Sequence, residues 1–402
     1  MDLQEAAEVT FEPERLENPE LIVGIPSLNE EETIANVVEQ VAGGLEKYYP
    51  DRESVIINVD NASTDKTRSE FLNAESLHCS KVYISTEEGK KGKGRNFHNL
   101  FEYVSLEEPE AVVVVDADLT SIRPEWMVKF FNPILEAGCD FVTPYYKRHP
   151  YDGTITNNLC YPITYAVNKY NVRQPIGGDF AFAGEMGEYW LQENWYECTM
   201  QYGIDIFQTT TSIYKGGKIG ITHLGKKAHK PSAPNLLPMF QEVCESLFNL
   251  LDDDRHIWTK FSNEIREPSR YFPPIGGETG FPDLTVDTEA IALRIEDTYD
   301  DYGDYLSLFL EPALAKKVVT MIEKQNYELH SDIWVEILLS AMKSYLKERD
   351  QRIIQGLLPV YFLRQISFIR KTRDLPPARC EEMFHEQAEQ LRQLVEKSNF
   401  PN

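Results

Sequence analysis

The sequence is poor in positive charge and contains no long apolar run. Its 402 residues include 40 lysines and arginines against 65 aspartates and glutamates, for a formal net charge of −25. So acidic a protein repels nucleic-acid backbones and anionic membranes, and we expect neither as a partner. No stretch reaches the roughly 18 consecutive apolar residues of a transmembrane helix. The first 20 residues carry seven acids and one arginine, unlike a signal peptide, so we expect a soluble, cytoplasmic protein.

Cysteine pairs and common nucleotide-binding motifs are also missing. The six cysteines are scattered without a CxxC motif, which favours reduced thiols over disulfides or a cysteine-based metal site. No GxxxxGK[ST] loop occurs, and no GxGxxG follows a predicted strand. The sequence therefore indicates neither a P-loop ATPase nor a dinucleotide-binding fold.

Short apolar runs alternate with amphipathic stretches in the first part of the chain. Asn29 followed by Glu32 resembles a capping box at the start of the first amphipathic stretch. This rhythm is typical of an α/β fold with an open, largely parallel sheet, which binds ligands beyond the carboxyl ends of its strands. The predicted strands are 21–25, 55–59, 82–84 and 111–115, and the predicted helices between the first of them are 29–49 and 65–75.

The pattern changes near residue 235, where helical spacing replaces the strand signals. A Pro/Gly-rich stretch at 268–282 is predicted to be a long loop. We expect an acidic N-terminal tail over 1–19, a catalytic α/β domain over 20–235 and a helical region over 236–402. The apolar stripes of the helical region favour a homodimer interface, although an internal core produces the same pattern.

Two carboxylates, Asp116 and Asp118, follow the apolar run at 111–115. Residues two apart point the same way from an extended chain, so the pair can converge on one divalent cation. Mg²⁺ or Mn²⁺ at this sheet edge would neutralise a ligand diphosphate. A polar strand end followed by a turn is the alternative interpretation.

A glycine-rich basic segment, Gly89–Arg95, follows the third predicted strand and holds four cations. Glycines let a backbone approach a ligand closely, and the cations suit phosphate groups, although a solvated surface loop is possible. Polar segments at Ile25–Glu31 and Val59–Asp65 follow the first two strands, where a base and ribose could lie. Either segment alone also fits an ordinary strand-to-helix turn.

In this order, these elements resemble the nucleotide-diphospho-sugar glycosyltransferases of the GT-A fold. More narrowly, the chain is similar to the retaining enzymes that make mannosylglycerate, glucosylglycerate and glucosyl-3-phosphoglycerate. The resemblance covers roughly residues 20–235, and no matching motif lies in the helical region. The matching segments are Ile25–Glu31, Val59–Asp65, Gly92–Gly94, Asp116–Ser121 with Pro124–Trp126, Arg148–Thr156, Gln174–Gly178, Tyr202–Asp205 and Gly225–His229.

The resemblance implies a role for each matching residue. Pro26, Glu30, Asp60, Lys93, Asp116, Ala117 and Gly178 would bind the donor nucleotide sugar; Asp118, His229 and Asp116 would hold Mg²⁺ or Mn²⁺; Arg148, Asp152 and Thr156 would bind the acceptor; Asp205, Ile176 and Gly177 would lie at the reacting centre. An arginine fork suits a carboxylate. Pro150 and Gly153 predict a loop entering a helix for the acceptor residues. Asp179 stands where related enzymes have glutamate, and this shorter carboxylate could alter the choice of sugar.

The implied activity is transfer of glucose or mannose from GDP-glucose, UDP-glucose or GDP-mannose to D-glycerate or 3-phosphoglycerate. Our first expectation is glucosyl transfer to D-glycerate. No residue is marked as a dedicated nucleophile, which favours attack by the acceptor on the face that the diphosphate leaves. The alternatives are an inverting polymer or lipid-linked sugar transferase and a non-catalytic sugar-nucleotide scaffold.

Overall fold

The computed structural model describes residues 3, 5–12, 16–228, 235–271, 284–398 and 400–401. These residues form two compact units. Unit 1 holds the described residues within 1–147, 176–232 and 268–280, and unit 2 holds those within 148–175, 233–267 and 281–402. The division differs from a single boundary at 235, because the stretch 148–175 belongs to unit 2.

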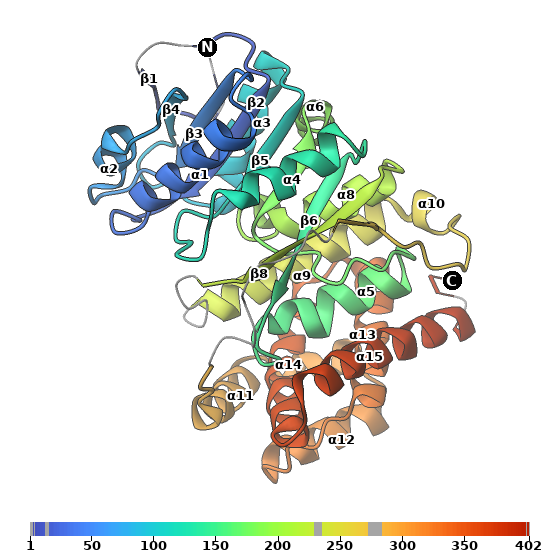
Figure 1. Cartoon of the computed structure of the whole chain (residues 1–402). Coiled ribbons are helices and arrows are strands. Elements are labelled where there is room, and N and C mark those ends of the chain that lie inside the picture. Colours follow the sequence, from blue (N-terminus) through green and yellow to red (C-terminus); the bar gives the residue numbers. More distant parts are fainter. Residues whose placement is uncertain are drawn as a thin grey trace. The chain divides into compact units, whose positions relative to one another are not determined.

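Unit 1 is built on one sheet (Figure 1). In the described part of the chain its strand order is β1-β4-β3-β2-β5-β7-β6-β8-β9. Only β1 and β7 among these strands run antiparallel to their neighbours, so the predicted largely parallel α/β sheet is confirmed. The strands are β1 (Glu8–Glu12), β2 (Leu21–Ser27), β3 (Ser54–Asp60), β4 (Ser80–Ser85), β5 (Ala111–Val114), β6 (Phe141–Lys147), β7 (Phe180–Ala183), β8 (Ile219–Lys226) and β9 (Ser269–Tyr271).

Helices cover both faces of this sheet. Leu21, Val23 and Ile25 of β2 share a core with α1 and α4, and the intervening Gly24 lies under α3, where an added Cβ would stand 2.6 Å from Leu100 Cδ2. Strand alternation therefore sends successive residues of β2 to helices on opposite faces. The helices of unit 1 are α1 (Ile34–Tyr48), α2 (Thr67–Asn73), α3 (Lys93–Glu107), α4 (Glu125–Leu135), α6 (Glu185–Leu191), α7 (Glu197–Met200) and α8 (Ile204–Tyr214).

Two features near the N-terminus differ from the sequence prediction. β1 lies in the acidic segment expected to be a tail, where it pairs with β4. The predicted capping box is wrong, because α1 begins at Ile34 and its cap, Thr33, makes no side-chain capping bond. Asn29 instead has a positive φ of 56° and accepts a hydrogen bond from the Thr64 amide at 2.9 Å. Asn29 therefore bonds the loop after β3 instead of capping α1.

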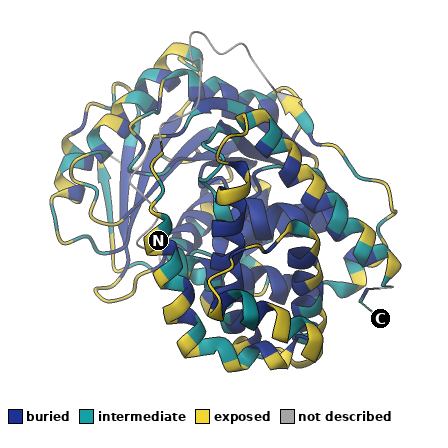
Figure 2. Cartoon of the chain, turned by 90° about the horizontal axis from the view of Figure 1, so that it is seen from below, coloured by how far each residue is buried: buried dark blue, intermediate teal, exposed yellow. Residues whose placement is uncertain are grey.

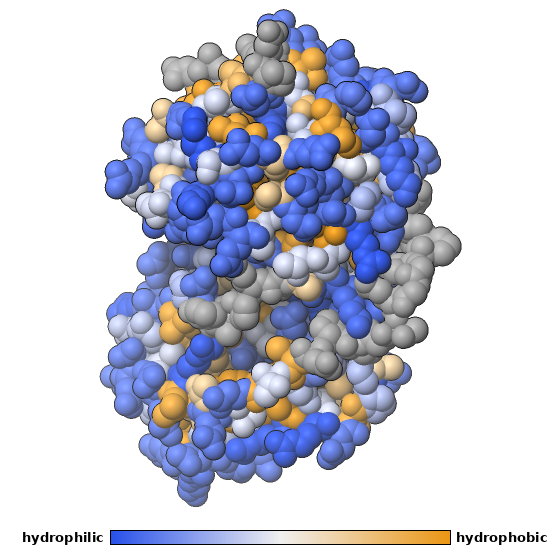
Figure 3. Space-filling view, turned by 60° about the vertical axis from the view of Figure 1, so that its left-hand side comes forward, coloured by the Kyte–Doolittle hydropathy of each residue, from blue (hydrophilic) through white to orange (hydrophobic). Residues whose placement is uncertain are grey.

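Unit 2 is helical, as predicted for the C-terminal region. Its central helix is α14, of whose 22 residues 17 are buried, and buried positions line the inner helix faces in Figure 2. No helix of the described residues is long and apolar enough to cross a membrane, and the face drawn in Figure 3 is mainly hydrophilic. The elements are η1 (Thr156–Cys160), α5 (Tyr161–Ala166), α9 (Leu236–Asp253), α10 (Arg255–Trp258), α11 (Thr288–Tyr302), η3 (Gly303–Leu308), α12 (Pro312–Glu323), α13 (Ser331–Glu348), α14 (Gln351–Thr372) and α15 (Pro377–Lys397). Homodimer formation stays a prediction.

Candidate active site

Five charged residues of unit 1 form one ion-paired cluster, called here the lysine–aspartate cluster. Its members come from the start of α3, the turn after β5, the residue before β7, the first turn of α8 and the residue after β8. They are Lys93, Asp116, Asp179, Asp205 and Lys227. Loops after β5 and β8 and the N-termini of two helices thus supply one site, the arrangement expected at the ligand-binding edge of an α/β sheet.

Asp116 lies between the two lysines. Its Oδ1 is 3.1 Å from Lys93 Nζ and its Oδ2 is 2.9 Å from Lys227 Nζ. Burial alone would raise the pKa of Asp116, but the charges of Lys227 and Lys93 outweigh it and hold that pKa well below its usual range. Asp116 is therefore a carboxylate across the physiological pH range, and both of its oxygens are engaged.

Asp179 is fully buried and fixes the turn that carries Asp116. Its Oδ1 accepts a 2.8 Å hydrogen bond from the Asp116 backbone N–H. Its Oδ2 accepts from Lys227 Nζ at 2.8 Å and from the Tyr146 hydroxyl. Asp179 is the shorter carboxylate noted in the sequence, and its side chain has no exposed surface. Its hydrogen bonds fix the positions of Asp116 and Lys227 from inside the protein.

Lys93 and Asp205 pair at 3.3 Å beside Asp116. Burial by itself would lower the pKa of Lys93, but Asp116, Asp205 and Asp179 together raise it above its ordinary value. Burial raises the pKa of Asp205, and the nearby charge of Lys93 offsets only part of that rise. Of the two aspartates beside Lys93, Asp205 therefore protonates more readily than Asp116.

A β-bulge and a left-handed glycine bring Lys227 into the cluster. Tyr145 of β6 pairs with His223 of β8, but the next residue, Tyr146, pairs with Gly225, so Leu224 is an extra residue. Gly225 has a φ of 85°, which only glycine adopts without strain. Bulges re-aim the side chains that follow them. The sequence singled out this segment as basic but gave no sign of the bulge.

Gly177 and Gly178 lie against the two lysines. The Gly177 carbonyl accepts from Lys227 Nζ at 3.0 Å, and the Gly178 carbonyl lies 3.4 Å from Lys93 Nζ. Gly178 has a φ of 88°, and an added Cβ would stand 2.5 Å from Asp116 Oδ2. A side chain is therefore excluded at Gly178. Ile176, predicted with these glycines to lie at the reacting centre, is half-buried.

The glycines around Lys93 serve packing inside the protein. An added Cβ on Gly92 would stand 2.2 Å from the Met200 carbonyl oxygen, and one on Gly94 would stand 1.9 Å from that of Thr199. The sequence predicted close approach to a phosphate, whereas this close approach is to the backbone of α7. Arg95 is likewise engaged, bridging Glu5 and Glu197 at 3.1 and 2.8 Å. Of the basic segment, Lys93 alone joins the cluster.

The predicted nucleoside residues lie at the ends of β2 and β3. Asp60 is fully buried and accepts four hydrogen bonds, from Ser27 Oγ at 2.6 Å, the Ser63 amide and hydroxyl at 2.7 and 2.6 Å, and Tyr83 OH at 3.0 Å. These bonds tie the two strand ends together. Pro26 is buried in β2, and half-buried Glu30 accepts from Thr33 Oγ1 at 3.2 Å.

The predicted metal ligands Asp116 and Asp118 do not lie on one extended strand. Ala117 and Asp118 form a turn, so the extended chain that would point Asp116 and Asp118 the same way is absent at this point. Ala117 is buried and Asp118 is half-buried. His229 lies outside the described residues, and within those residues no group of three His, Cys, Asp or Glu side chains is spaced to hold a metal. Ala228, however, bonds through its carbonyl and amide to Thr120 N and Ser121 Oγ, both at 3.0 Å, just after Asp118.

The predicted acceptor residues lie in unit 2, in a loop entering a helix as expected. Arg148 Nη1 and Thr156 Oγ1 lie 3.2 and 3.8 Å from the position that a Cβ on Gly153 would occupy, so these side chains converge over the glycine. Gly153 has a φ of 62°. Asp152 Oδ1 accepts a 2.8 Å bond from the Gly153 amide, which fixes the turn. This segment therefore carries the guanidinium of Arg148, the hydroxyl of Thr156 and the carboxylate of Asp152.

The family model and the relative that match this chain both describe glycosyltransferases. Residues 22–186 match the model of glycosyl transferase family 2. A curated relative, glucosyl-3-phosphoglycerate synthase of Mycolicibacterium smegmatis, is 27% identical over 227 residues, which is 52% of this chain and 69% of that protein.

Crystal structures of glucosyl-3-phosphoglycerate synthase from Mycobacterium tuberculosis are also similar to this chain. The complex with Mn²⁺, UDP and phosphoglyceric acid is 23% identical with a TM-score of 0.47, covering 57% of this chain and 78% of that one. The complex with Mg²⁺ and UDP is 23% identical with a TM-score of 0.46, covering 57% and 79%. The family match and the observed sheet together confirm the GT-A fold class. The chain is therefore a nucleotide-sugar-dependent glycosyltransferase, in which residues 22–186 match the model of glycosyl transferase family 2.

Proposed function

We propose that the chain transfers a glucosyl residue, with retention of configuration, from a nucleotide diphosphate sugar to the hydroxyl of a glycerate-type acceptor, with D-glycerate as the first candidate. The observation that carries this proposal is the lysine–aspartate cluster, which offers two ammonium groups beside the predicted donor glycines. GDP-mannose is the alternative donor that the sequence resemblance leaves open.

In this proposal the two lysines bind the diphosphate. Lys93 and Lys227 are compact cations already stripped of most of their water, since their side chains are 17% and 4% exposed. Phosphate oxygens compete with Asp116 for the same donors, and a partly desolvated ammonium binds a developing negative charge more strongly than one in water. The lysines would therefore stabilise the departing diphosphate.

A divalent metal, Mg²⁺ or Mn²⁺, belongs to the proposal. We assign Asp118 to hold it together with Asp116, whose two oxygens bond lysines in the ligand-free cluster and are released when these lysines bond the diphosphate. The hydrogen bonds between Ala228 and the Thr120–Ser121 turn support a contribution from His229, whose role stays a prediction. When bound, such a cation neutralises diphosphate charge as a Lewis acid.

Retention is the finer part of the proposal. Each carboxylate of the lysine–aspartate cluster contacts a lysine, and Asp205 pairs with Lys93. None of them is marked as a nucleophile. We therefore assign Asp205 to holding Lys93 and hydrogen-bonding sugar hydroxyls, with the acceptor attacking on the face that the diphosphate leaves. Arg148 would pair with the acceptor carboxylate, and Asp152 and Thr156 would bind its hydroxyls.

A second acceptor, 3-phosphoglycerate, is favoured by the name of the 27% identical relative. The test incubates the purified chain with Mg²⁺, GDP-glucose, UDP-glucose or GDP-mannose, and each of the two acceptors. We expect nucleoside diphosphate release that depends on one of these acceptors, and an axial glycosidic linkage from an axial donor by NMR. No release with any pair would overturn the proposal.

Replacing Asp118 separates a metal-dependent enzyme from a scaffold. We expect Asp118→Ala to lose turnover by about 10²-fold or more, because a metal site contributes several kcal/mol to the stabilisation of the leaving group. Asp51→Ala, which changes an exposed aspartate in the turn before β3, is the matched control and keeps wild-type turnover. Equal activity of the two variants would remove Asp118 from the site.

A further inference from the structure

The segment that carries the predicted acceptor residues, Arg148–Thr156, is called here the acceptor segment. It runs into a wide helical turn next to a proline. Thr156–Cys160 form the π-helix η1, and Pro162 lies in the first turn of α5 directly after it. Proline has no N–H, so Pro162 cannot donate to Asn158 O, four residues back, or to Asn157 O, five residues back. Its ring also crowds the Asn158 carbonyl, which accounts for the widening of the turn.

Side chains from two distant helices supply donors to these two carbonyls. Gln387 of α15 donates from Nε2 to Asn157 O at 3.0 Å, and Trp334 of α13 donates from Nε1 to Asn158 O at 2.9 Å. Both side chains are fully buried. Because a buried carbonyl without a donor is costly, these two bonds stabilise the π-helix.

The orientation of Gln387 is set by a buried charge. Arg364 of α14 donates from Nε and Nη2 to Gln387 Oε1 at 3.0 and 2.9 Å. A guanidinium can only donate, so the amide oxygen must face Arg364 and the amide nitrogen must face Asn157. Arg364 is 2% exposed, and its hydrogen bonds in the described part of the chain go to neutral oxygens, the second being Leu329 O. Burial lowers its pKa to about 10, so it remains charged at neutral pH.

The same hydrogen bonds reach the acceptor residues. Asn157 Nδ2 donates to the Asp152 carbonyl at 3.0 Å, and Arg173 Nη2 donates to Asn157 Oδ1 at 2.8 Å. A continuous set of bonds therefore runs from Arg364 through Gln387 and Asn157 to Asp152. Thr156 is the first residue of the π-helix itself.

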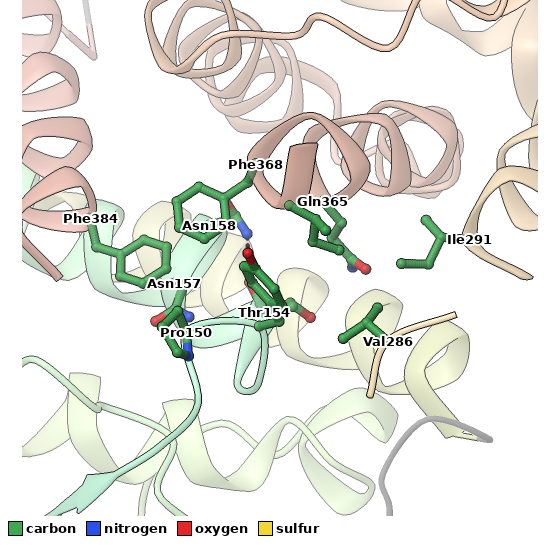
Figure 4. A pocket seen from close by; sticks show the side chains of 11 residues that line it. Pro150, Thr154, Asn157, Asn158, Val286, Ile291, Gln365, Phe368 and Phe384 are labelled. Atoms are coloured by element: carbon green, nitrogen blue, oxygen red, sulfur yellow. Dashed lines mark hydrogen bonds between the residues drawn. The ribbon is translucent and has the colours of Figure 1, made fainter. Parts of the chain in front are cut away.

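A cavity of about 30 Å³ backs the segment (Figure 4), room for about two water molecules. Thr154, Asn157 and Asn158 line it on one side, and Gln365 and Phe368 of α14 line it on the other. Beside the cavity the segment contacts α14, through a 2.6 Å hydrogen bond between Thr154 Oγ1 and Tyr361 OH and a ring contact between Tyr151 and Phe368. At Asn157 and Asn158, which line the cavity, the bonds from Gln387 and Trp334 hold the turn. Loss of those bonds would leave it room to shift.

We propose that Gln387 and Trp334 are positioning residues for the acceptor, which they do not touch. They hold the carbonyls of Asn157 and Asn158 and thereby set the turn that carries Asp152 and Thr156. This inference rests on the proposed function, from which it takes acceptor binding by that segment. It gives the C-terminal helices a part in acceptor recognition, a part that no motif in them indicates.

Two variants test the proposal. Gln387→Glu keeps an oxygen for Arg364 and adds a countercharge to it, but turns a second carboxylate oxygen toward Asn157 O. Trp334→Phe removes the indole N–H. We expect each variant to raise the KM for the acceptor about tenfold or more, because misplacing a binding group by about 1 Å has effects of this size or larger. The KM for the nucleotide sugar changes by less than about twofold.

Each variant has a matched control in the same unit. Trp258 also donates a buried indole N–H to a carbonyl, Leu251 O at 2.8 Å, outside the acceptor segment. Gln393 lies on α15 with Gln387 but is exposed. Trp258→Phe and Gln393→Glu therefore keep the wild-type KM for the acceptor. Acceptor KM values no higher in the test variants than in these controls, or equal rises for donor and acceptor, overturn the proposal.

Hydrogen exchange gives a readout independent of activity. In the ligand-free chain, amides of 154–161 exchange faster in Gln387→Glu and Trp334→Phe than in wild type or the controls. If wild type uses an acceptor unrelated to glycerate, the proposed function is wrong, and the KM comparison with that acceptor still tests the positioning. Unchanged exchange at these amides would remove the role of both side chains in holding the turn.

Discussion

The lysine–aspartate cluster of unit 1 and the acceptor segment of unit 2 are held by different forces. In unit 1 three carboxylates and two ammonium groups bond one another at 2.8 to 3.3 Å. In unit 2 neutral amide and indole groups bond the carbonyls of the turn, and the cations Arg364 and Arg173 bond amide oxygens of Gln387 and Asn157. Charge dominates the first site, and backbone hydrogen-bond satisfaction dominates the second.

This difference in bonding indicates how each site can respond to a ligand. Ion pairs exchange partners readily when a new anion competes, so the two lysines can leave Asp116 for a phosphate group. A hydrogen-bonded turn has no such alternative partner, and we expect it to present the same geometry before and after binding. A diphosphate needs strong, exchangeable charge, whereas a small acceptor needs fixed geometry.

The largest effect in unit 1 is expected for Lys93→Met. Lys93 has a side chain that is only 17% exposed and contacts Asp116 and Asp205, so its loss removes charge from the predicted diphosphate site. We expect turnover to fall about 10²- to 10³-fold, the usual range for one stabilising donor. Lys91→Met, at an exposed lysine of the same segment, is the control. Similar rates in both variants would show that the charge of this cluster does not act on the reaction.

The next largest effect is expected for Asp179→Asn, which tests whether this buried carboxylate orders the cluster. The variant leaves Lys227, whose side chain is 4% exposed, with one carboxylate instead of two. We expect the free energy of unfolding in urea to fall by about 3 kcal/mol, as for other broken buried pairs. Affinity for GDP-glucose, UDP-glucose and GDP-mannose then falls by similar factors. A selective change of sugar preference would instead place Asp179 against the donor sugar.

The two sites also differ in how far they could be predicted from the sequence. Lys93, Asp116 and the parallel strands were found because charged residues at strand ends and apolar runs are local patterns. The i, i+2 argument for Asp116 and Asp118 assumed an extended chain, whereas Ala117 and Asp118 form a turn, and their joint role at a metal stays a prediction. The glycines beside Lys93 are needed for contact with α7, 105 or more residues further along the chain, which no local pattern encodes.

The support of the acceptor segment could not be predicted at all. Gln387 and Trp334 lie 230 and 176 residues from the carbonyls that they bond. In the sequence each fits an ordinary helix position, since a buried Gln or Trp is recognised only by the partner that tertiary structure supplies. Pro162 was the one local signal, because a proline there removes one backbone donor from this turn, and the carbonyl that it would have bonded needs another donor.

A smaller effect is expected in the pH dependence of folding stability, where Asp116 and Asp205, the two aspartates beside Lys93, should behave differently. Because the lysines outweigh burial and depress the pKa of Asp116, its stabilising contribution is present above the unfolded value of about 3.9 and is lost as the pH falls through the folded value. Asp205 has the opposite sign, since burial raises its pKa: its contribution is present below about 3.9 and lost as the pH rises through the folded value.

The paired test measures urea unfolding of Asp116→Asn and Asp205→Asn at pH 7 and near pH 3. At pH 7 we expect Asp116→Asn to lose about 2 kcal/mol, because it breaks two ion pairs of low exposure, and Asp205→Asn to be neutral or stabilising. Near pH 3 the difference between the two variants narrows, because the unfolded chain takes up protons at both positions while folded Asp116 still keeps its charge. A gap between them that does not depend on pH would contradict these assignments.

The smallest effect contrasts buried with exposed charge. Raising the salt concentration from about 0.1 to 1 M shortens the Debye length from about 10 to 3 Å, which screens exposed charges far more than buried ones. The cost of Asp116→Asn should therefore change by less than about 0.5 kcal/mol. Arg52 bonds Glu20 and Glu110 at 2.7 and 2.6 Å with a side chain that is 33% exposed, so the small cost of Arg52→Met, about 0–1 kcal/mol, should vanish at high salt.

The wild-type chain, with a net charge of −25, should itself become more stable, because its surface acids repel one another less. If salt instead removed the cost of Asp116→Asn, the cluster would behave as a surface pair, and its strength as a diphosphate site would have to come from a bound cation.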